Sequence, residues 1–249
     1  MYHYVAYPFD IAKTNRILNT SFNRECGENL GKELVALYNR GQMQHGVYRG
    51  MLPLFGITFI NSSLGGYYFD VSGINLLVTT TLTNPLNTLM THRQVINSTT
   101  FAEPSYRQVM SNWGANIPKL FTLGYTAALT RNALLMTAFL PKTLGSDWAP
   151  LDAGFAFGAL IVSHPFEVAR TLIVCQEKNR MIGSTLSTLQ SLYSAEGVAG
   201  LYKGLIPRLL HTYPVLLTLV VATKVGANQS TFEGLRTNPI FGSLKLSSS

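Results

Sequence analysis

The chain has 249 residues, and its 19 Lys and Arg against 12 Asp and Glu give a formal net charge of +7. Charged residues make up 12 % of the chain, whereas a soluble domain carries about 25 %. The mean hydropathy is positive, at +0.17. This composition excludes a disordered chain, disfavours an ordinary soluble enzyme and favours a protein whose solvent is lipid.

Motifs of enzyme chemistry are missing from the sequence. Two cysteines, Cys26 and Cys175, are too few for a disulfide scaffold and cannot form a zinc site alone. There is no Walker loop, dinucleotide fingerprint or nucleophile with a base at motif spacing, so we expect no enzymatic activity, no metal and no cofactor. There is also no cleavable signal segment, so a targeting signal would have to be internal.

Apolar stretches of membrane-crossing length follow one another at residues 51–69, 71–90, 120–140, 149–174 and 206–225. A helix of about 20 residues crosses the hydrocarbon core of a bilayer. The stretches contain Gly, Pro, Asn, Ser or Thr, which suits helices packed around a polar interior. The alternative, core helices of a soluble protein, is disfavoured because few charges remain to cover a surface. We therefore predict an all-α membrane protein, with a short amphipathic surface helix at residues 24–39.

The basic residues gather in three polar segments. Residues 13–49, 91–120 and 170–203 hold 13 of the 19 Lys and Arg. If the apolar stretches cross the membrane alternately, all three segments lie on one face, and the positive-inside rule makes it the inner face. Because these cations lie in membrane loops, nucleic acid is a disfavoured partner.

A proline-acid-base landmark recurs along the chain. It reads Pro8, Asp10 and Lys13 in the first copy, and Pro165, Glu167 and Arg170 in the third. The middle copy keeps Pro85 but carries Asn87 and Met90 in place of the charges. The prolines are 77 and 80 residues apart, so the chain contains a threefold internal repeat.

A second landmark follows each proline. It reads Tyr48-Arg49-Gly50, Leu123-Gly124 and Tyr202-Lys203-Gly204. The spacing from proline to glycine is 42, 39 and 39 residues. In the third copy, the acidic-glycine pair Glu196-Gly197 lies between the two landmarks.

With these landmarks the sequence resembles the mitochondrial carrier family, the three-repeat solute carriers of the inner membrane. The resemblance implies a bundle of about six transmembrane helices with short surface helices on the matrix side. It divides the chain into repeats at 1–73, 74–148 and 149–230, followed by a C-terminal tail at 231–249. The third repeat fits the family pattern completely, and the second fits by spacing only.

The resemblance implies a matrix gate, in which the acid of one repeat pairs with the base of the next. Its residues here are Pro8, Asp10, Lys13, Pro85, Asn87, Pro165, Glu167 and Arg170. We expect the Glu167–Lys13 pair to survive, Asp10 to lose its partner to Met90, and Asn87 to offer Arg170 a hydrogen bond at best. The surviving pair is either a working gate or a fixed structural bridge. The family's opposite gate is incomplete in all three copies, at residues 69–73, 139–142 and 222–224.

The resemblance also places solute contacts seven residues past each repeat glycine. These positions are Ile57, Arg131 and His211, with Asn132 beside the second. Because a guanidinium at membrane depth is costly, Arg131 is either an anion contact, as in carriers of keto or carboxylic acids, or a structural residue bonded to carbonyls or a neighbouring helix. We interpret His211 as a packing residue.

The basic turns that open the even-numbered helices resemble cardiolipin sites of the family. The residues are Tyr48, Arg49, Gly50, Gly197, Tyr202, Lys203 and Gly204. Helix N-termini attract phosphate, and basic pockets at this depth suit the cardiolipin head group. The alternative is a plain helix start with interfacial anchors.

Only seven residues precede Pro8, so we expect a shortened first helix. Together with the eroded gates, this favours an accessory subunit of a larger inner-membrane assembly, such as a respiratory complex, over an efficient transporter. The alternative is an active carrier exchanging a small anionic metabolite, a keto or carboxylic acid. A third hypothesis is an outer-membrane relative that acts in protein insertion.

Overall fold

The computed structural model describes residues 2–19, 26, 29–39, 51–64, 73–95, 121–139, 149–176, 184–214 and 216, and most of these are helical with no strand among them. The helices are α1 (Tyr2–Ile17), α3 (Leu30–Asn39), α4 (Met51–Leu64), α5 (Gly73–Gln94), α8 (Tyr125–Met136), the 3-10 turn η3 (Thr137–Phe139), α10 (Ala149–Gln176) and α11 (Thr185–Leu201). Residues 205–214 form a further helix. The prediction of an all-α fold is confirmed.

The helices coincide with the apolar stretches expected from the sequence. Of the described helices, one contains a stretch that is long and apolar enough to cross a membrane, the 25 residues Leu151–Cys175 of α10. A shorter apolar stretch, Met51–Ile60, lies in α4. Length and composition thus support one crossing, and crossing by the other helices stays a prediction.

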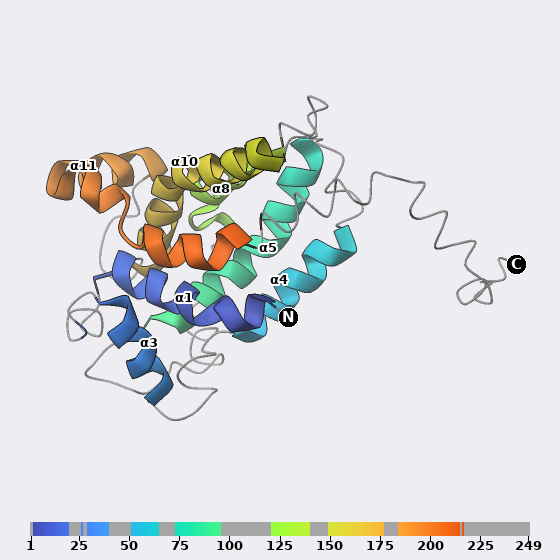
Figure 1. Cartoon of the computed structure of the whole chain (residues 1–249). Helices are drawn as coiled ribbons and strands as arrows, with labels where there is room; N and C mark the ends of the chain where they lie inside the picture. Colours follow the sequence, from blue (N-terminus) through green and yellow to red (C-terminus); the bar gives the residue numbers. More distant parts are fainter. Residues whose placement is uncertain are drawn as a thin grey trace, which may run out of the picture.

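Neighbouring helices pack in a connected bundle (Figure 1). α10 packs against α8, α11, α5 and α1, while α5 also contacts α4 and α8. α1 lies across α5 and α10 and contacts α3. The first proline helix therefore touches the other two, as a threefold arrangement requires.

Each repeat proline lies inside a helix that continues through it. Pro8 is within α1, Pro85 within α5 and Pro165 within α10. Proline cannot donate to the carbonyl four residues earlier, so each helix carries one interrupted hydrogen bond at the same place in its repeat. The repeat seen in the sequence is therefore also a repeat of helix architecture.

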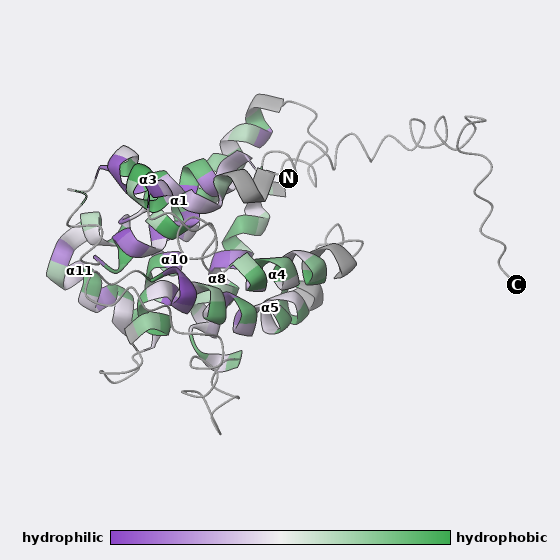
Figure 2. Ribbon diagram, turned by 90° about the horizontal axis from the view of Figure 1, so that it is seen from below, coloured by the Kyte–Doolittle hydropathy of each residue, from purple (hydrophilic) through white to green (hydrophobic). Residues whose placement is uncertain are grey.

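Large apolar side chains are exposed at helical spacing along several helices. On α4 these are Leu52, Phe55 and Phe59, and on α5 they are Leu77, Val78 and Leu82. Figure 2 shows apolar positions along both helices. Water disfavours such faces and lipid does not, so they agree with the composition in favouring a membrane environment.

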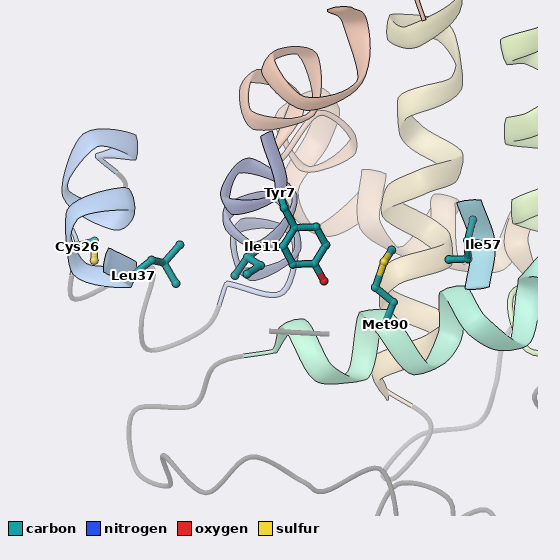
Figure 3. Close-up of a cluster of buried hydrophobic side chains, with 6 residues drawn as sticks. All are labelled: Tyr7, Ile11, Cys26, Leu37, Ile57 and Met90. Atoms are coloured by element: carbon teal, nitrogen blue, oxygen red, sulfur yellow. The ribbon is translucent and has the colours of Figure 1, made fainter. Parts of the chain in front are cut away.

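A cluster of apolar side chains joins α1, α3, α4 and α5. Its buried members are Tyr7, Ile11, Cys26, Leu37, Ile57 and Met90 (Figure 3). In Figure 3 the Tyr7 ring points from α1 towards Met90 on α5. The middle-repeat position that lacks a base is thus occupied by an apolar packing residue.

The predicted surface helix is shorter than expected. It was expected over residues 24–39, and α3 begins at Leu30. Leu37 is fully buried, as its place on the apolar side predicts, but Tyr38 is 76 % exposed. Glu33 is also fully buried. Its charge is compensated there by Arg16 of α1, whose Nε lies 3.0 Å from the Glu33 Oε2. An ion pair therefore fastens α3 to α1.

Candidate functional site

The gate residues of the first and third repeats meet where α1 crosses α10. The buried Lys13 Nζ lies 2.8 Å from Glu167 Oε1 and 2.6 Å from Asp10 Oδ1. Asp10 and Lys13 are three residues apart and share one face of α1, which allows both to reach the crossing. The prediction that the Glu167–Lys13 pair survives is confirmed.

Arg131, the expected solute contact on α8, is bonded to the same carboxylate. Its Nη1 lies 2.6 Å from Glu167 Oε2. Its Nε and Nη2 also donate to Asn132 Oδ1, over 3.0 and 2.8 Å. Glu167 therefore uses one oxygen for Lys13 and the other for Arg131, and it links the solute position to the gate.

Asn132 holds Arg131 in this orientation. The Asn132 Nδ2 donates to Thr80 Oγ1 on α5 over 3.0 Å, while its oxygen accepts from Arg131. The amide thus ties the guanidinium to a third helix. Of the two interpretations of Arg131, a bond to a neighbouring helix is observed, and contact with an anion is a further step that this bond does not test.

Asp10 is bonded by a residue that the sequence analysis did not single out. Gln94 Nε2 on α5 donates to Asp10 Oδ2 over 2.6 Å. Gln94 Oε1 accepts from Thr14 Oγ1 over 2.7 Å, and its backbone oxygen accepts from Asn15 Nδ2 over 2.9 Å. Asp10 meets no base from α5, as expected, but a neutral clamp replaces the lost ion pair.

The sequence feature that could have identified Gln94 is its spacing from Met90. It lies four residues after Met90 and therefore on the same face of α5, one turn further along. We define the gate cluster as Asp10, Lys13, Gln94, Arg131 and Glu167. Hydrogen bonds and ion pairs connect them in the order Gln94, Asp10, Lys13, Glu167 and Arg131.

The third expected contact of the gate is absent from the described residues. They contain no hydrogen bond between Asn87 and Arg170. The backbone oxygen of Asn87 accepts a hydrogen bond from Thr91 Oγ1 over 2.8 Å. Arg170 is buried, and its Nε and Nη2 have no hydrogen-bond partner there. At the position where the other repeats carry an acid, Asn87 therefore supplies Arg170 with neither a charge nor a side-chain bond in the described structure.

A second buried arginine fastens the last helix (205–214) to α10. Arg208 Nη2 donates to Ser163 Oγ over 2.9 Å, and its Nη1 donates to the Leu160 backbone oxygen over 3.2 Å. The same Nη1 lies 3.2 Å from His164 Nδ1. A cation inside the apolar stretch 206–225 is the sequence signal that could have identified this bracing residue.

The other expected solute positions converge on the same part of α1. Ile57 is 8 % exposed and belongs to the apolar cluster with Tyr7 and Ile11. His211 Nδ1 lies 3.8 Å from Asp10 Oδ1 and 3.3 Å from Thr212 Oγ1. Ile57 and His211 thus lie near α1, whereas Arg131 reaches the gate cluster through Glu167 of α10.

The third-repeat turn at the expected cardiolipin site is occupied by protein contacts. The Tyr202 ring stacks on His164 with a centroid distance of 6.0 Å, and His164 Nε2 lies 2.9 Å from the Lys203 backbone oxygen. The Lys203 Nζ pairs with Glu196 Oε2 at 2.5 Å. Gly197 and Gly204 both have positive φ, at 65° and 75°. Tyr48, Arg49 and Gly50 lie outside the described residues.

Comparison with known proteins shows what the third repeat and the longer chain are similar to. Residues 148–225 match the family model described as mitochondrial carrier protein. The chain is 30 % identical over 117 residues to "Mitochondrial thiamine pyrophosphate carrier 1" of Neurospora crassa, covering 43 % of this chain and 35 % of the relative. It is 25 % identical over 165 residues to the protein of the same name from Meyerozyma guilliermondii, covering 58 % of this chain and 56 % of the relative.

Residues 148–225 are thus similar to mitochondrial carrier proteins. The match to the family model falls on the third repeat, where the sequence pattern is complete. The chain covers between about a third and just over half of the relatives' lengths, 35 % and 56 %. These comparisons support the resemblance to the mitochondrial carriers and assign neither a solute nor a partner to this chain.

Proposed function

We propose that this protein moves a small anionic solute across the mitochondrial inner membrane, with Arg131 as the contact for the anionic group. The observation that carries the proposal is the 2.6 Å ion pair between Arg131 Nη1 and Glu167 Oε2. It joins a cation at the expected solute position to the acid that also holds Lys13.

The geometry supports a simple competition. A solute anion that binds Arg131 replaces Glu167 at the guanidinium, and Glu167 then keeps Lys13 alone. A carboxylate with one cation in place of two is held less firmly, so anion binding weakens the contact between α8 and α10 beside the gate. Solute binding and gate release would thereby be one event.

The names of the relatives supply the first solute to test. Both are called thiamine pyrophosphate carriers, and thiamine pyrophosphate presents a diphosphate anion. Keto and carboxylic acids, expected from Arg131 and its neutral neighbour, are the second class. A guanidinium recognises both groups through paired hydrogen bonds.

The accessory-subunit hypothesis has no observation of its own among the described residues. The relatives are named as carriers, which favours transport, and we therefore place transport first. Location in the inner membrane with several crossings belongs to the same proposal. A native gel gives the direct check on assembly: a carrier acting alone runs as a free species, and a subunit runs with a large complex.

Cardiolipin binding at the Tyr202-Lys203-Gly204 turn is retained as a subordinate proposal. The turn precedes the last helix, whose N-terminal amides favour a phosphate. A lipid phosphate would have to compete with Glu196 for the Lys203 ammonium. Because that ion pair is partly exposed, the competition is a modest one.

Transport is tested with the full chain in proteoliposomes. We expect saturable exchange of labelled thiamine pyrophosphate or of a keto acid, falling by about tenfold or more in Arg131→Gln, which loses the charged contact. Lys32→Gln, a change of an exposed cation on α3, serves as the matched control and should exchange normally. Flux no greater than in protein-free vesicles for every anion tried would refute the proposal.

A further inference from the structure

Arg170 is the residue that the gate cluster leaves unsatisfied. It is 2 % exposed, yet its Nε and Nη2 have no hydrogen-bond partner in the part of the chain that the structure describes. These two nitrogens form the side-on fork with which a guanidinium grips an oxyanion. Burying an unpaired charge in a protein interior has a high cost in free energy. Binding an anion at these two nitrogens would lower that cost.

The internal repeat explains why no carboxylate of the described residues pairs with these two nitrogens. Asp10 and Glu167 occupy the second position after the repeat proline in the first and third copies. The matching position of the middle copy is Asn87, which is neutral. α5, which carries it, packs against α10 but supplies no carboxylate to Arg170.

The two nearby carboxylates are already committed. Asp10 is held by Lys13 and Gln94, and Glu167 by Lys13 and Arg131. Glu167 also lies within electrostatic reach of Arg170 and Arg208, but it makes no hydrogen bond to either in the described structure. Four cations, Lys13, Arg131, Arg170 and Arg208, thus surround two carboxylates, Asp10 and Glu167.

Two of these four cations, Arg131 and Arg170, interact electrostatically with each other, and both act on Glu167. Two guanidinium groups at close range repel unless an anion lies between them. An anion with oxygens on both sides relieves this repulsion and satisfies the free fork of Arg170 at the same time.

We infer that Arg170 is a second anion contact, which together with Arg131 selects a solute bearing a phosphate or diphosphate group. The inference rests on the proposed function and extends it, because it assigns a solute class and a residue of the gate motif to solute recognition. A phosphate or diphosphate carries enough oxygens to pair with the fork of Arg170 and to contact Arg131 at the same time. A solute with a single, small carboxylate reaches one arginine and leaves the other unpaired.

The inference makes an unusual prediction for the unliganded protein. Arg170→Met keeps an unbranched side chain in the space beside Gly124 and Val174. It also removes the unpaired charge of the guanidinium. The variant should be at least as stable as the original chain without anion, and it should bind inorganic pyrophosphate about tenfold or more weakly. A purely structural Arg170 would give the opposite result, a loss of stability with unchanged affinity.

Asn87→Asp is the second variant. It places an acid at the position where the other repeats carry one, so Arg170 gains a protein partner. We expect a higher thermal midpoint without anion and a weaker response to pyrophosphate. Lys32→Met, which removes an exposed cation on α3, controls for net charge and should bind as the original chain does.

The measurement is the thermal midpoint of the purified full chain in mild detergent, titrated with inorganic pyrophosphate, thiamine pyrophosphate, thiamine and pyruvate, which has a single carboxylate. Stabilisation by both diphosphates but not by thiamine, lost in Arg170→Met, supports the inference. Pyrophosphate affinity within about twofold of the original chain in Arg170→Met overturns it, as does equal stabilisation by pyruvate.

Transport assays separate this inference from the proposed function. If Arg131→Gln abolishes exchange and Arg170→Met leaves its KM for thiamine pyrophosphate unchanged, transport stands and the role of Arg170 fails. If pyrophosphate binding depends on Arg170 but no anion is exchanged by the original chain, the contact stands and the transport proposal fails.

Discussion

Glu167 carries two cations on one buried side chain. It is 4 % exposed and bonds Lys13 of α1 with one oxygen and Arg131 of α8 with the other. A buried carboxylate with good geometry to two donors satisfies groups that would otherwise be stranded. At the scale of single residues, this side chain is therefore the point on which the candidate site depends most.

Replacing this carboxylate should be costly. Glu167→Gln leaves Lys13 with one acid and Arg131 with none, and we expect a loss of about 3–5 kcal/mol in unfolding free energy. Glu196→Gln is the matched control, because its pair with Lys203 is partly exposed and contributes about 0–1 kcal/mol. Equal midpoints for the two variants in detergent unfolding experiments would contradict the structure.

Gln94 provides a second test at this scale. Gln94→Leu removes the 2.6 Å donor to Asp10 and the acceptor for Thr14. A hydrogen bond to a charged group contributes about 1.5–3 kcal/mol, so we expect destabilisation of that size. Thr81→Val on α5, whose hydroxyl is exposed, is a suitable control. A Gln94→Leu chain as stable as the control would show that the clamp contributes nothing.

The sequence predicted part of this network, and geometry explains the rest. The pairing of Glu167 with Lys13 follows from repeated motifs, because equivalent positions in a repeat meet in equivalent ways. The bonds of Arg131 to Glu167 and of Gln94 to Asp10 depend on which helical turns face each other at a crossing. Spacing places position 94 on the same face of α5 as Met90, but no local pattern around position 94 or 131 shows which residue of a neighbouring helix lies opposite.

At the scale of elements, the turn before the last helix packs against α1 backbone to backbone. A Cβ built on Gly204 lies 3.0 Å from the Lys13 backbone oxygen and 3.3 Å from Ile17 Cγ1, and the glycine has a φ of 75°. Only glycine combines this conformation with this approach. The residue that the sequence analysis assigned to lipid thus has a packing role that the structure makes explicit.

Three glycines separate the effects of contact and conformation. We expect Gly204→Ala to lose about 1–3 kcal/mol, because it adds both a close contact and a strained φ. Gly197→Ala tests strain alone, since its φ is 65° and its Cβ meets nothing within 4 Å. Gly158→Ala, inside α10 with open space, should be neutral or stabilise by up to about 1 kcal/mol. Unfolding midpoints in any other order would contradict this account.

At the scale of the whole molecule, the all-α architecture and the positions of the apolar helices were predictable because they follow from hydrophobic length. Their crossing of the membrane is supported by length for Leu151–Cys175 and by exposed apolar faces on α4 and α5. The start of α3 at Leu30 follows from Asn29, whose Oδ1 accepts from the Lys32 backbone N–H as an N-cap, a signal that the sequence analysis missed. The Arg16–Glu33 ion pair that holds this turn to α1 depends on tertiary packing and was not predictable.

The distribution of basic segments makes a topological prediction. In a chain whose Cys26 and Cys175 are replaced by Ser, single cysteines at the exposed positions 32 and 187 should react with a membrane-impermeant maleimide from the same side of intact vesicles. A cysteine at position 59, exposed on the apolar face of α4, should react from neither side. Labelling of positions 32 and 187 from opposite sides would refute the arrangement.

Two of the contacts of α1 differ in kind. An ion pair connects α1 to α10, and a hydrogen bond from a side-chain amide connects it to α5. Dissolved salt and trans-bilayer voltage act on the former far more than on the latter. We therefore expect α1 to separate from α10 before it separates from α5 when the electrostatic environment changes. The contact with α5 would then act as the hinge of this movement.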